Sequence, residues 1–340
     1  MIKEAIDKLA RKEDLSLAEA RGVFSQVMDG KLTPAQTAAL LMGLRAKGET
    51  PLEMRALVEI MRTKSLKLKV RTKRAEIVFD TCGTGGKKIK TFNISTAAAF
   101  VIAALGVKVA KHGNRSFSGV CGSADVLEAA GLNLSVSPKV VERAVKKLGI
   151  GFLYAPLYHS AMRNVASVRR EMGVRTIFNI VGPLTNPANA SHQLMGVYDK
   201  DLTEKVAAVL RDLGTKRAYV VWAEGLGDEV SIIGPTKVTE VRNKKLRTFY
   251  LTPSDLGLKK SKLAQIRGTS VKDNLNALIS VLSGKPSAKL DAVIASAACC
   301  LVICGKAKSF KPAAKMARVA IKSGAALRKF RQLKGFLKNA

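Results

Sequence analysis

The sequence predicts an α/β fold, in which a small all-helical domain precedes a larger domain whose mostly parallel sheet is flanked by helices. Two observations predict this class. The first seventy residues carry only helical signals, and from Ala75 onward short β-rich runs alternate with helical stretches. Strands that alternate with helices are typical of βαβ units, in which neighbouring strands run parallel. With 340 residues the chain is long enough for two domains, because a domain takes roughly 100–200 residues.

Capping residues predict the helices of the first part. Ser16 and Glu19 have the spacing of a capping box. Thr33 and Thr50 each precede a proline, the arrangement of an N-cap followed by the first helical residue, and Gly48 is expected to end the helix between them. Apolar residues in that helix predict packing on more than one side: Ala39, Leu40, Met42 and Leu44.

Four β-rich runs predict the sheet: "EIVF" at 76–79, "VKVA" at 107–110, "GFLYA" at 151–155 and "AYVVWA" at 218–223. Three of them lead directly into unusual loops, "DTCGTGG", "KHGNRSFSG" and "EGLGDE". Ligands of parallel sheets bind at the carboxyl ends of the strands. We therefore expect these three loops to meet at one edge of the sheet.

Composition indicates a soluble globular protein with no membrane association. The apolar fraction is 47%, the mean hydropathy is +0.08, and no apolar run is long enough to span a bilayer. The N-terminus carries acids and lacks the apolar core of a signal peptide. Five cysteines show no disulfide framework and no CxxC pattern, so a cytoplasmic location is expected.

The net charge of +32 is the unusual feature of the composition, and no acid occurs between Ala292 and Ala340. Such a charge attracts polyanions, which include nucleic acid, anionic membranes and phosphorylated small molecules. A lineage-wide bias toward basic proteins would give the same composition.

The first loop has the residues of a phosphate site. In "GTGG" (83–86) glycines let backbone N–H groups approach phosphate oxygens, and the next helix adds the positive end of its dipole. The motif is neither a Walker A loop nor a dinucleotide fingerprint. "NIST" (93–96) opens that helix with three hydrogen-bonding side chains, although capping requires only one.

The other two loops extend this pattern. "KHGNRSFSG" (111–119) with "GSAD" (122–125) is rich in cations and hydroxyls, which a purely structural loop does not require. Asp228 and Glu229 are adjacent carboxylates after a strand. They indicate a Mg²⁺ site, because protein-bound Mg²⁺ is coordinated by carboxylate oxygens together with phosphate oxygens of a substrate. The sequence has three histidines and no HExxH motif, so zinc is not expected.

Several motifs, in order and spacing, resemble the anthranilate phosphoribosyltransferases of tryptophan biosynthesis. They are "DTCGTGG", "TFNIST", "KHGNRSFSGVCGSADVLEAAG", "HSAMRNVASVRREMGVRTIFNIVGPLTNP", "GLGDEVS" and the N-terminal "DGKLTPAQTAALLMGLRAKGETPLEM". The resemblance implies a helical domain at 1–70 with a returning segment near 163–190. It also implies an α/β domain at 71–162 and 191–340, a homodimer formed through the helical domain, and a fold shared with pyrimidine nucleoside phosphorylases.

The resemblance implies transfer of the phosphoribosyl group from phosphoribosyl pyrophosphate to the amine of anthranilate, with Mg²⁺ and without a covalent nucleophile. It also implies site residues. Those for phosphoribosyl pyrophosphate are Gly83, Gly86, Lys87, Thr91, Asn93, Ile94, Ser95, Thr96, Lys111, His112, Gly113, Asn114, Arg115, Ser116, Ser118, Gly119 and Ser123. Those for anthranilate are Gly83, His112, Asn114, Pro156, His159 and Arg169, and those for the metal are Ser95, Asp228 and Glu229.

One position departs from the family pattern. The residue after "GTGG" is usually aspartate, and here it is Lys87, followed by Lys88. We expect Lys87 to meet the diphosphate directly and fewer Mg²⁺ ions to be bound. A Lys87→Asp variant with unchanged Mg²⁺ dependence would contradict this hypothesis.

Two other functions are compatible with parts of the sequence. A nucleic-acid-binding relative of the same fold would explain the charge, since phosphate contacts give salt-dependent binding without base specificity. Such a protein does not need all four loop motifs together, so nucleic acid is expected only as a non-specific partner. A nucleoside phosphorylase is the second alternative. The loop "KHGNRSFSG", which is not a "KHS"-type loop, argues against it, and so does Arg169, which is placed for a carboxylate.

Overall fold

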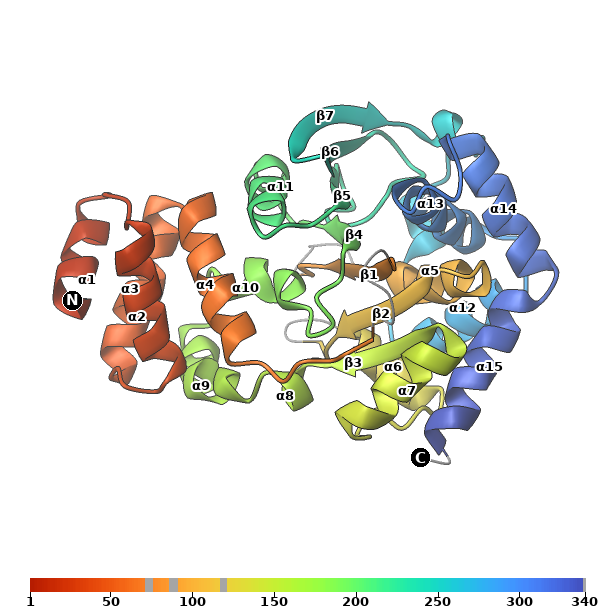
Figure 1. Cartoon of the computed structure of the whole chain (residues 1–340). Coiled ribbons are helices and arrows are strands. Elements are labelled where there is room, and N and C mark those ends of the chain that lie inside the picture. The colour runs from red at the N-terminus through yellow and green to blue at the C-terminus, as the bar shows by residue number, and fades with distance from the viewer. Residues whose placement is uncertain (71–75, 86–90, 117–120, 339–340) are drawn as a thin grey trace.

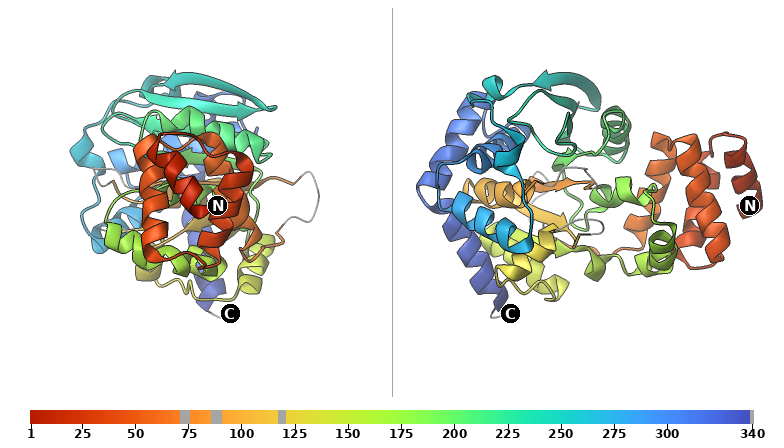
Figure 2. Two further views of the ribbon diagram at one scale, coloured as in Figure 1. Left: turned by 90° about the vertical axis from the view of Figure 1, so that its left-hand side faces the viewer. Right: turned by 180° about the vertical axis from the view of Figure 1, so that it is seen from behind.

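The computed structural model describes residues 1–70, 76–85, 91–116 and 121–338. A helical part protrudes from one side of a larger α/β part, and the two termini lie at opposite ends of the molecule (Figures 1 and 2). The helical part begins with α1 (Ile2–Ala10), α2 (Leu17–Met28), α3 (Pro34–Lys47) and α4 (Pro51–Thr63).

The predicted capping signals of this part are confirmed. Ser16 caps α2 in a capping box with Glu19, and Thr33 and Thr50 cap α3 and α4 in the same way. Gly48 ends α3 with φ at +93°, a backbone conformation that favours glycine. Local sequence therefore determines where these helices begin and end.

Within the single chain, α3 buries one face. Leu40 and Leu44 are fully buried, but Ala39 is exposed and Met42 is 44% exposed. In a helix these two pairs lie on opposite faces. The buried face contacts α1 and α9 (Arg163–Met172), and nothing in the described chain covers the other face.

A seven-stranded sheet forms the centre of the α/β part, in the order β3-β2-β1-β4-β5-β6-β7. The first five strands of that order are parallel, and β6 and β7 pair antiparallel at one edge. This confirms the predicted fold class. The bounds are β1 Val78–Gly83, β2 Lys108–Gly113, β3 Ile150–Tyr154, β4 His192–Gly196, β5 Arg217–Ala223, β6 Thr236–Arg242 and β7 Lys245–Leu251.

Helices cover both faces of this sheet (Figure 1). The first group is α5 (Ile94–Ala104), α6 (Ser123–Ala129), α7 (Pro138–Leu148), α12 (Val271–Leu282), α13 (Ala288–Ile303), α14 (Phe310–Lys322) and α15 (Ala325–Lys338). On the other face α11 (Leu202–Asp212) packs against β5 and β6. The short helix α8 (Ala155–Tyr158) follows β3, and α9 and α10 (Phe178–Val181) contact the helical part. Short 3₁₀ turns lie at Ser160–Met162, Gly182–Thr185, Pro253–Leu256 and Leu263–Ile266.

Side-chain alternation along the central strands divides the interior into two hydrophobic clusters. In β4, Leu194 packs into the cluster with α5 and α13, whereas its neighbour Met195 packs into the cluster with α11 and the helical part. In β5, Val221 and Val220 divide in the same way. The helical part is thus joined to one face of the sheet by continuous apolar packing.

The segment after α8 lies with the helical part. Val165 of α9 and Phe178 of α10 belong to the same hydrophobic cluster as α2 and α4. Arg62 of α4 donates from Nε and Nη2 to the carbonyl of Leu184, at 2.9 and 2.7 Å, which ties α4 to the turn at 182–185. The predicted domain boundaries themselves stay a prediction.

No helix in the described part of the chain has the length and apolarity needed to cross a membrane. Cys299 and Cys300 are fully buried in α13, and burial raises the pKa of both thiols. This agrees with the packing role that their apolar surroundings indicate.

Candidate active site

The loops that the sequence singled out meet at the carboxyl edge of the parallel strands. β1 and β4 are adjacent and in register there, with Gly83 opposite Gly196. Asp228 and Glu229 follow the neighbouring strand β5, and Ser95 lies in the first turn of α5, which follows β1. Because these strands are parallel, their ends bring distant parts of the chain to one place.

Two glycines allow the acidic loop to approach the ends of these strands. A Cβ at Gly196 would overlap the carbonyl oxygen of Asp228 and lie 2.7 Å from its Cα. A Cβ at Gly83 would lie 2.5 Å from the carboxylate Oδ2 of Asp228. With glycine at position 83, Asp228 Oδ2 has room there and accepts a hydrogen bond from the backbone N–H of Gly85 at 2.9 Å. Glycine at both strand ends therefore determines where Asp228 lies.

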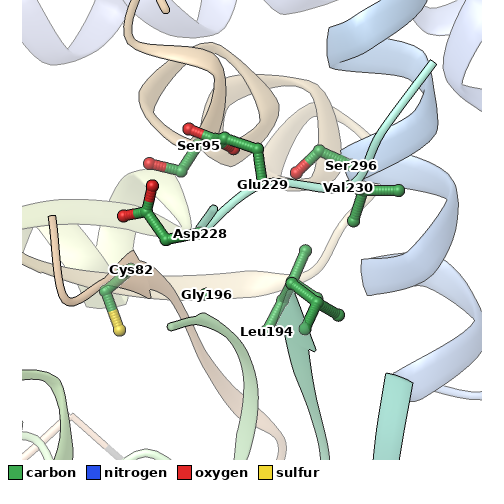
Figure 3. Close-up of a pocket in the computed structure, with 10 residues that line it drawn as sticks. Cys82, Ser95, Leu194, Gly196, Asp228, Glu229, Val230 and Ser296 are labelled. Atoms are coloured by element: carbon green, nitrogen blue, oxygen red, sulfur yellow. The ribbon is translucent and has the colours of Figure 1, made fainter. Parts of the chain in front are cut away.

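A small cavity of about 30 Å³ lies among these groups. In Figure 3 the oxygens of Ser95, Asp228 and Glu229 lie near one another on one side of it, while the sulfur of Cys82 points away. Carboxylate and hydroxyl oxygens are the ligands of hard cations such as Mg²⁺. The described residues contain no group of three His, Cys, Asp or Glu side chains that could hold a metal, so a cation here would need further oxygen ligands, such as those of a phosphate.

Beneath the cavity lies a buried charge network. Asp80 is fully buried in β1 and accepts hydrogen bonds from the backbone N–H of His112 at 3.0 Å and from Asn186 Nδ2 at 2.7 Å. The ammonium of Lys111, also buried, donates to the carbonyl of Thr81 and to Ser95 Oγ, the latter at 3.3 Å.

Burial acts on both charged groups of this network. It raises the pKa of Asp80 and lowers the pKa of Lys111, while each group's charge favours the ionised form of the other. The Lys111 ammonium therefore supports Ser95 through its contact with Ser95 Oγ.

The "NIST" loop leaves buried polar atoms without partners. Asn93 is the N-cap of α5, yet its side chain makes no capping hydrogen bond. Within the described residues, Thr91 Oγ1, Asn93 Oδ1 and Thr96 Oγ1 are buried and have no hydrogen-bond partner. Buried polar groups of folded proteins are normally paired. Helix capping alone thus does not explain these three polar side chains. Ile94, in the same motif, is buried in the core, so only its backbone is available to a ligand.

The second loop folds tightly onto the start of α6. A Cβ at Gly122 would lie 2.5 Å from the backbone nitrogen of Ser116, and Asp125 accepts from the N–H groups of Ser116 and Gly122 at 3.0 and 2.7 Å. Gly113 lies against the hydroxyl of Ser123. Asn114 and Arg115 are exposed. The predicted site residues Gly86, Lys87, Ser118 and Gly119 lie outside the described residues.

Two of the three histidines form a buried pair. The rings of His112 and His159 have centroids 5.1 Å apart, and each side chain is 7% exposed. Burial lowers the pKa of His112 to about 3 and that of His159 to about 4. Both imidazoles are therefore neutral at pH 7, and Nε2 of each has no hydrogen-bond partner among the described residues. Pro156 lies nearby in sequence, exposed at the start of α8.

This pair predicts a loss of stability in mild acid. In the unfolded chain histidine titrates near pH 6.5, so below that pH the unfolded state binds protons that folded His112 and His159 do not. The free energy of unfolding should therefore fall as pH is lowered from about 6.5 to 5, by about 1.4 kcal/mol per pH unit for each histidine. Urea unfolding of the chain and of a His112→Gln variant measures this. An equal slope in the two proteins would contradict the prediction.

Arg169 lies on α9 with its guanidinium 5.3 Å from the ring centroid of Phe178. Burial lowers its pKa, and a partly desolvated guanidinium held over an aromatic ring is typical of sites that bind planar anions.

Three residues of this region were not identified as site residues from the sequence: Asp80, Asn186 and Gly196. A carboxylate directly after an apolar β-rich run signals Asp80, and the "GPLTNP" block contains Asn186. Gly196 has no local signal, because its contact with Asp228 joins residues 32 positions apart.

Fold and site together define a class of enzyme that places a phosphate-bearing substrate at the carboxyl edge of a parallel sheet. Residues 75–327 match the family described as "Glycosyl transferase family, a/b domain", and residues 3–65 match "Glycosyl transferase family, helical bundle domain". The class is therefore that of the glycosyltransferases.

Comparison with individual relatives identifies the family within this class. The chain is 47% identical over 340 residues to the anthranilate phosphoribosyltransferase of Persephonella marina, covering 99% of each chain. The crystal structure of the Thermus thermophilus anthranilate phosphoribosyltransferase is 39% identical with a TM-score of 0.91, covering 98% of this chain and 99% of that one. The chain belongs to the anthranilate phosphoribosyltransferase family.

A third relative agrees in fold. The Saccharomyces cerevisiae anthranilate phosphoribosyltransferase, solved in complex with PRPP and Mg, has a TM-score of 0.91 at 24% identity, with 100% of this chain and 98% of that chain covered. At this identity the likeness bears on the fold alone.

Proposed function

We propose that this protein transfers the phosphoribosyl group of phosphoribosyl pyrophosphate to the amine of anthranilate, releasing diphosphate, in tryptophan biosynthesis. One observation carries the proposal: the ends of β1, β4 and β5 bring Ser95, Asp228 and Glu229 around one cavity. Beside it lies a loop whose buried polar atoms have no partner among the described residues. Full-length similarity to anthranilate phosphoribosyltransferases supports the choice of substrates.

In the proposed reaction the amine attacks C1 of the ribose as the diphosphate leaves. No side chain need form a covalent intermediate. Positioning of the two substrates and neutralisation of the leaving group's charge account for the rate. The backbone of the glycine loop and the polar atoms of Thr91, Asn93 and Thr96 would hold the phosphates and ribose, while Lys111 would keep Ser95 in place.

The proposed metal is Mg²⁺, and the oxygen donors of Ser95, Asp228 and Glu229 fit it. When bound, Mg²⁺ stabilises negative charge on the departing diphosphate. With one hydroxyl and two carboxylates, these residues leave coordination positions for phosphate oxygens. The hypothesis that Lys87 replaces part of this metal charge rests on the sequence alone.

We propose that anthranilate binds between Arg169 and the histidine pair. An arginine fork suits a carboxylate, which it binds bidentately. His112 and His159 are neutral at pH 7, so they offer an aromatic wall that does not compete with the arginine for the carboxylate. Asn114 is exposed on the adjacent loop, and Gly83 lies at the end of β1. Pro156 completes this proposed path.

Loss of anthranilate fluorescence after addition of phosphoribosyl pyrophosphate and Mg²⁺ tests the function directly. No loss, with Mg²⁺ and both substrates present, would contradict it. Conversion of thymidine with inorganic phosphate would instead favour a nucleoside phosphorylase. Steeply salt-sensitive nucleic-acid binding without transfer would favour a binding protein.

Arg169→Met is expected to raise the KM for anthranilate about tenfold or more, because it removes a charge-assisted hydrogen bond. The KM for phosphoribosyl pyrophosphate should change little. Arg170→Met is the matched control, since Arg170 is exposed on the same helix. Equal KM values for anthranilate in the two variants would remove Arg169 from the proposed site.

We also propose the division into a helical domain at 1–70 with 163–190 and an α/β domain at 71–162 and 191–340, with a hinge that closes the site. The contact of Arg62 with Leu184 would hold α4 to the returning segment during such a motion. A cytoplasmic homodimer formed through the helical domain is proposed as well. The exposed Met42 and Leu52 are compatible with a covered face there, and light scattering in solution measures the mass.

A further inference from the structure

A second cavity, of about 420 Å³, lies between α7 and α15. The two helices pack side by side at the end of the molecule that carries the C-terminus (Figure 1). Lys147 and Leu148 line the cavity at the end of α7, shortly before β3, so the cavity lies toward the amino end of that strand. The candidate active site is at the opposite, carboxyl edge of the sheet. Cavities of about 300–1,000 Å³ are the usual size for small-molecule sites.

In the described part of the chain the cavity is lined by three cations and no acid: Arg143 and Lys147 from α7, and Arg331 from α15. All three are exposed, and none has a side-chain hydrogen bond or ion pair among the described residues. The acid next to Arg143, Glu142, is paired with Lys146 at 2.5 Å and with the backbone N–H of Lys69 at 3.2 Å. Among the residues that the structure describes, therefore, no acid neutralises these charges.

Between the cations the cavity has an apolar surface. Leu148 and Phe336 line it and are both half-buried. Lys329 of α15 donates to the carbonyl of Leu148 at 2.8 Å, which ties the two walls together. A bare phosphate would satisfy the cations but would leave this apolar surface in contact with water. The lining thus suits a ligand with both a multiply charged anionic group and a flat apolar body.

We propose that this cavity is a nucleotide site, in which the base lies against Phe336 and Leu148 and the phosphates are bound by Arg143, Lys147 and Arg331. Arginine forks bind phosphates bidentately, and aromatic rings stack on planar bases. The proposal does not depend on the transferase reaction, because none of these residues belongs to the candidate active site.

Calorimetric titration of the full chain with ATP tests this proposal, with excess phosphoribosyl pyrophosphate and Mg²⁺ present to occupy the candidate active site. We expect saturable binding of one ATP per chain. The double variant Arg143→Glu and Arg331→Glu should weaken it by about tenfold or more, since charge-assisted hydrogen bonds are lost. Lys315→Glu, at an exposed cation of α14 outside the cavity, is the matched control and should change binding by less than about twofold.

A second comparison separates stacking from charge. Phe336→Leu should weaken ATP binding while leaving the binding of inorganic triphosphate unchanged. Three outcomes would overturn the proposal: no ATP binding, equal weakening by Lys315→Glu and by the double variant, or binding of a single-stranded oligonucleotide with none of ATP. Equal weakening by Lys315→Glu would indicate that the overall charge of +32, and not this cavity, attracts ATP. Binding of the oligonucleotide alone would indicate a polymeric partner.

Discussion

Gly196→Ala is expected to lower kcat/KM for phosphoribosyl transfer by about a hundredfold or more, because a displacement of about 1 Å at a reacting site has an effect of that size. The added Cβ would overlap the carbonyl oxygen of Asp228 and approach its Cα to 2.7 Å. Both are backbone atoms, so no side-chain rotation relieves the clash. The loop must move, and it carries Asp228 and Glu229 away from Ser95. Steady-state assays with both substrates and Mg²⁺ measure the loss.

Gly234→Ala is the matched control for this substitution. Its added Cβ would meet no atom within 4 Å, and its φ lies outside the range that favours glycine. We expect its activity to stay within about twofold of the unchanged chain. The thermal unfolding midpoint of each variant shows whether a loss of activity is merely a loss of folding. A fully active Gly196→Ala variant would show that the position of Asp228 does not matter for transfer.

Asp80→Ala is expected to reduce the free energy of unfolding by about 2–5 kcal/mol, because each buried donor that loses its acceptor costs about 1–3 kcal/mol. The substitution removes the buried negative charge that favours the ionised form of Lys111. It also leaves the His112 N–H and the Asn186 amide without their acceptor. Since Lys111 contacts Ser95, activity should fall together with stability. Urea unfolding at pH 7 measures the first effect.

Asp212→Ala provides the comparison for Asp80→Ala. Asp212 pairs with Arg211 at 2.8 Å on the surface, with side chains 34% and 37% exposed. Such pairs contribute about 0–1 kcal/mol, so this variant should be nearly as stable as the unchanged chain. Asp80→Asn keeps one acceptor oxygen but no charge, so its free energy of unfolding should lie between those of Asp80→Ala and Asp212→Ala. If Asp80→Ala were as stable as Asp212→Ala, the buried network would not stabilise the fold.

Most of the helical part could be predicted from the sequence, because capping depends on residues three or four positions apart. Ser16 with Glu19 and Thr50 before Pro51 are examples. The edge hairpin was missed in spite of a local signal. Its turn at Asn243 and Lys244 has φ of +51° and +59°, and asparagine is common at such positions.

β4 has little local signal. "HQLMG" contains no β-branched residue, and its strand conformation depends on pairing with β1 and β5 on either side. A central parallel strand is stabilised by partners that are remote in sequence, so its own composition predicts it poorly. The same holds for the short helix α10, whose apolar residues pack against α4 more than a hundred positions earlier.

By itself, the sequence determined the fold class, the helix ends and the three loops that carry glycines, cations and paired acids, since each depends on neighbouring residues. Tertiary structure alone decided how these loops come together. It placed the Asp228 backbone against Gly196, buried Asp80 with Lys111, and lowered the pKa values of His112 and His159 by removing them from water. Close approach and desolvation depend on atoms that only the folded chain brings together, which is why local patterns do not reveal them.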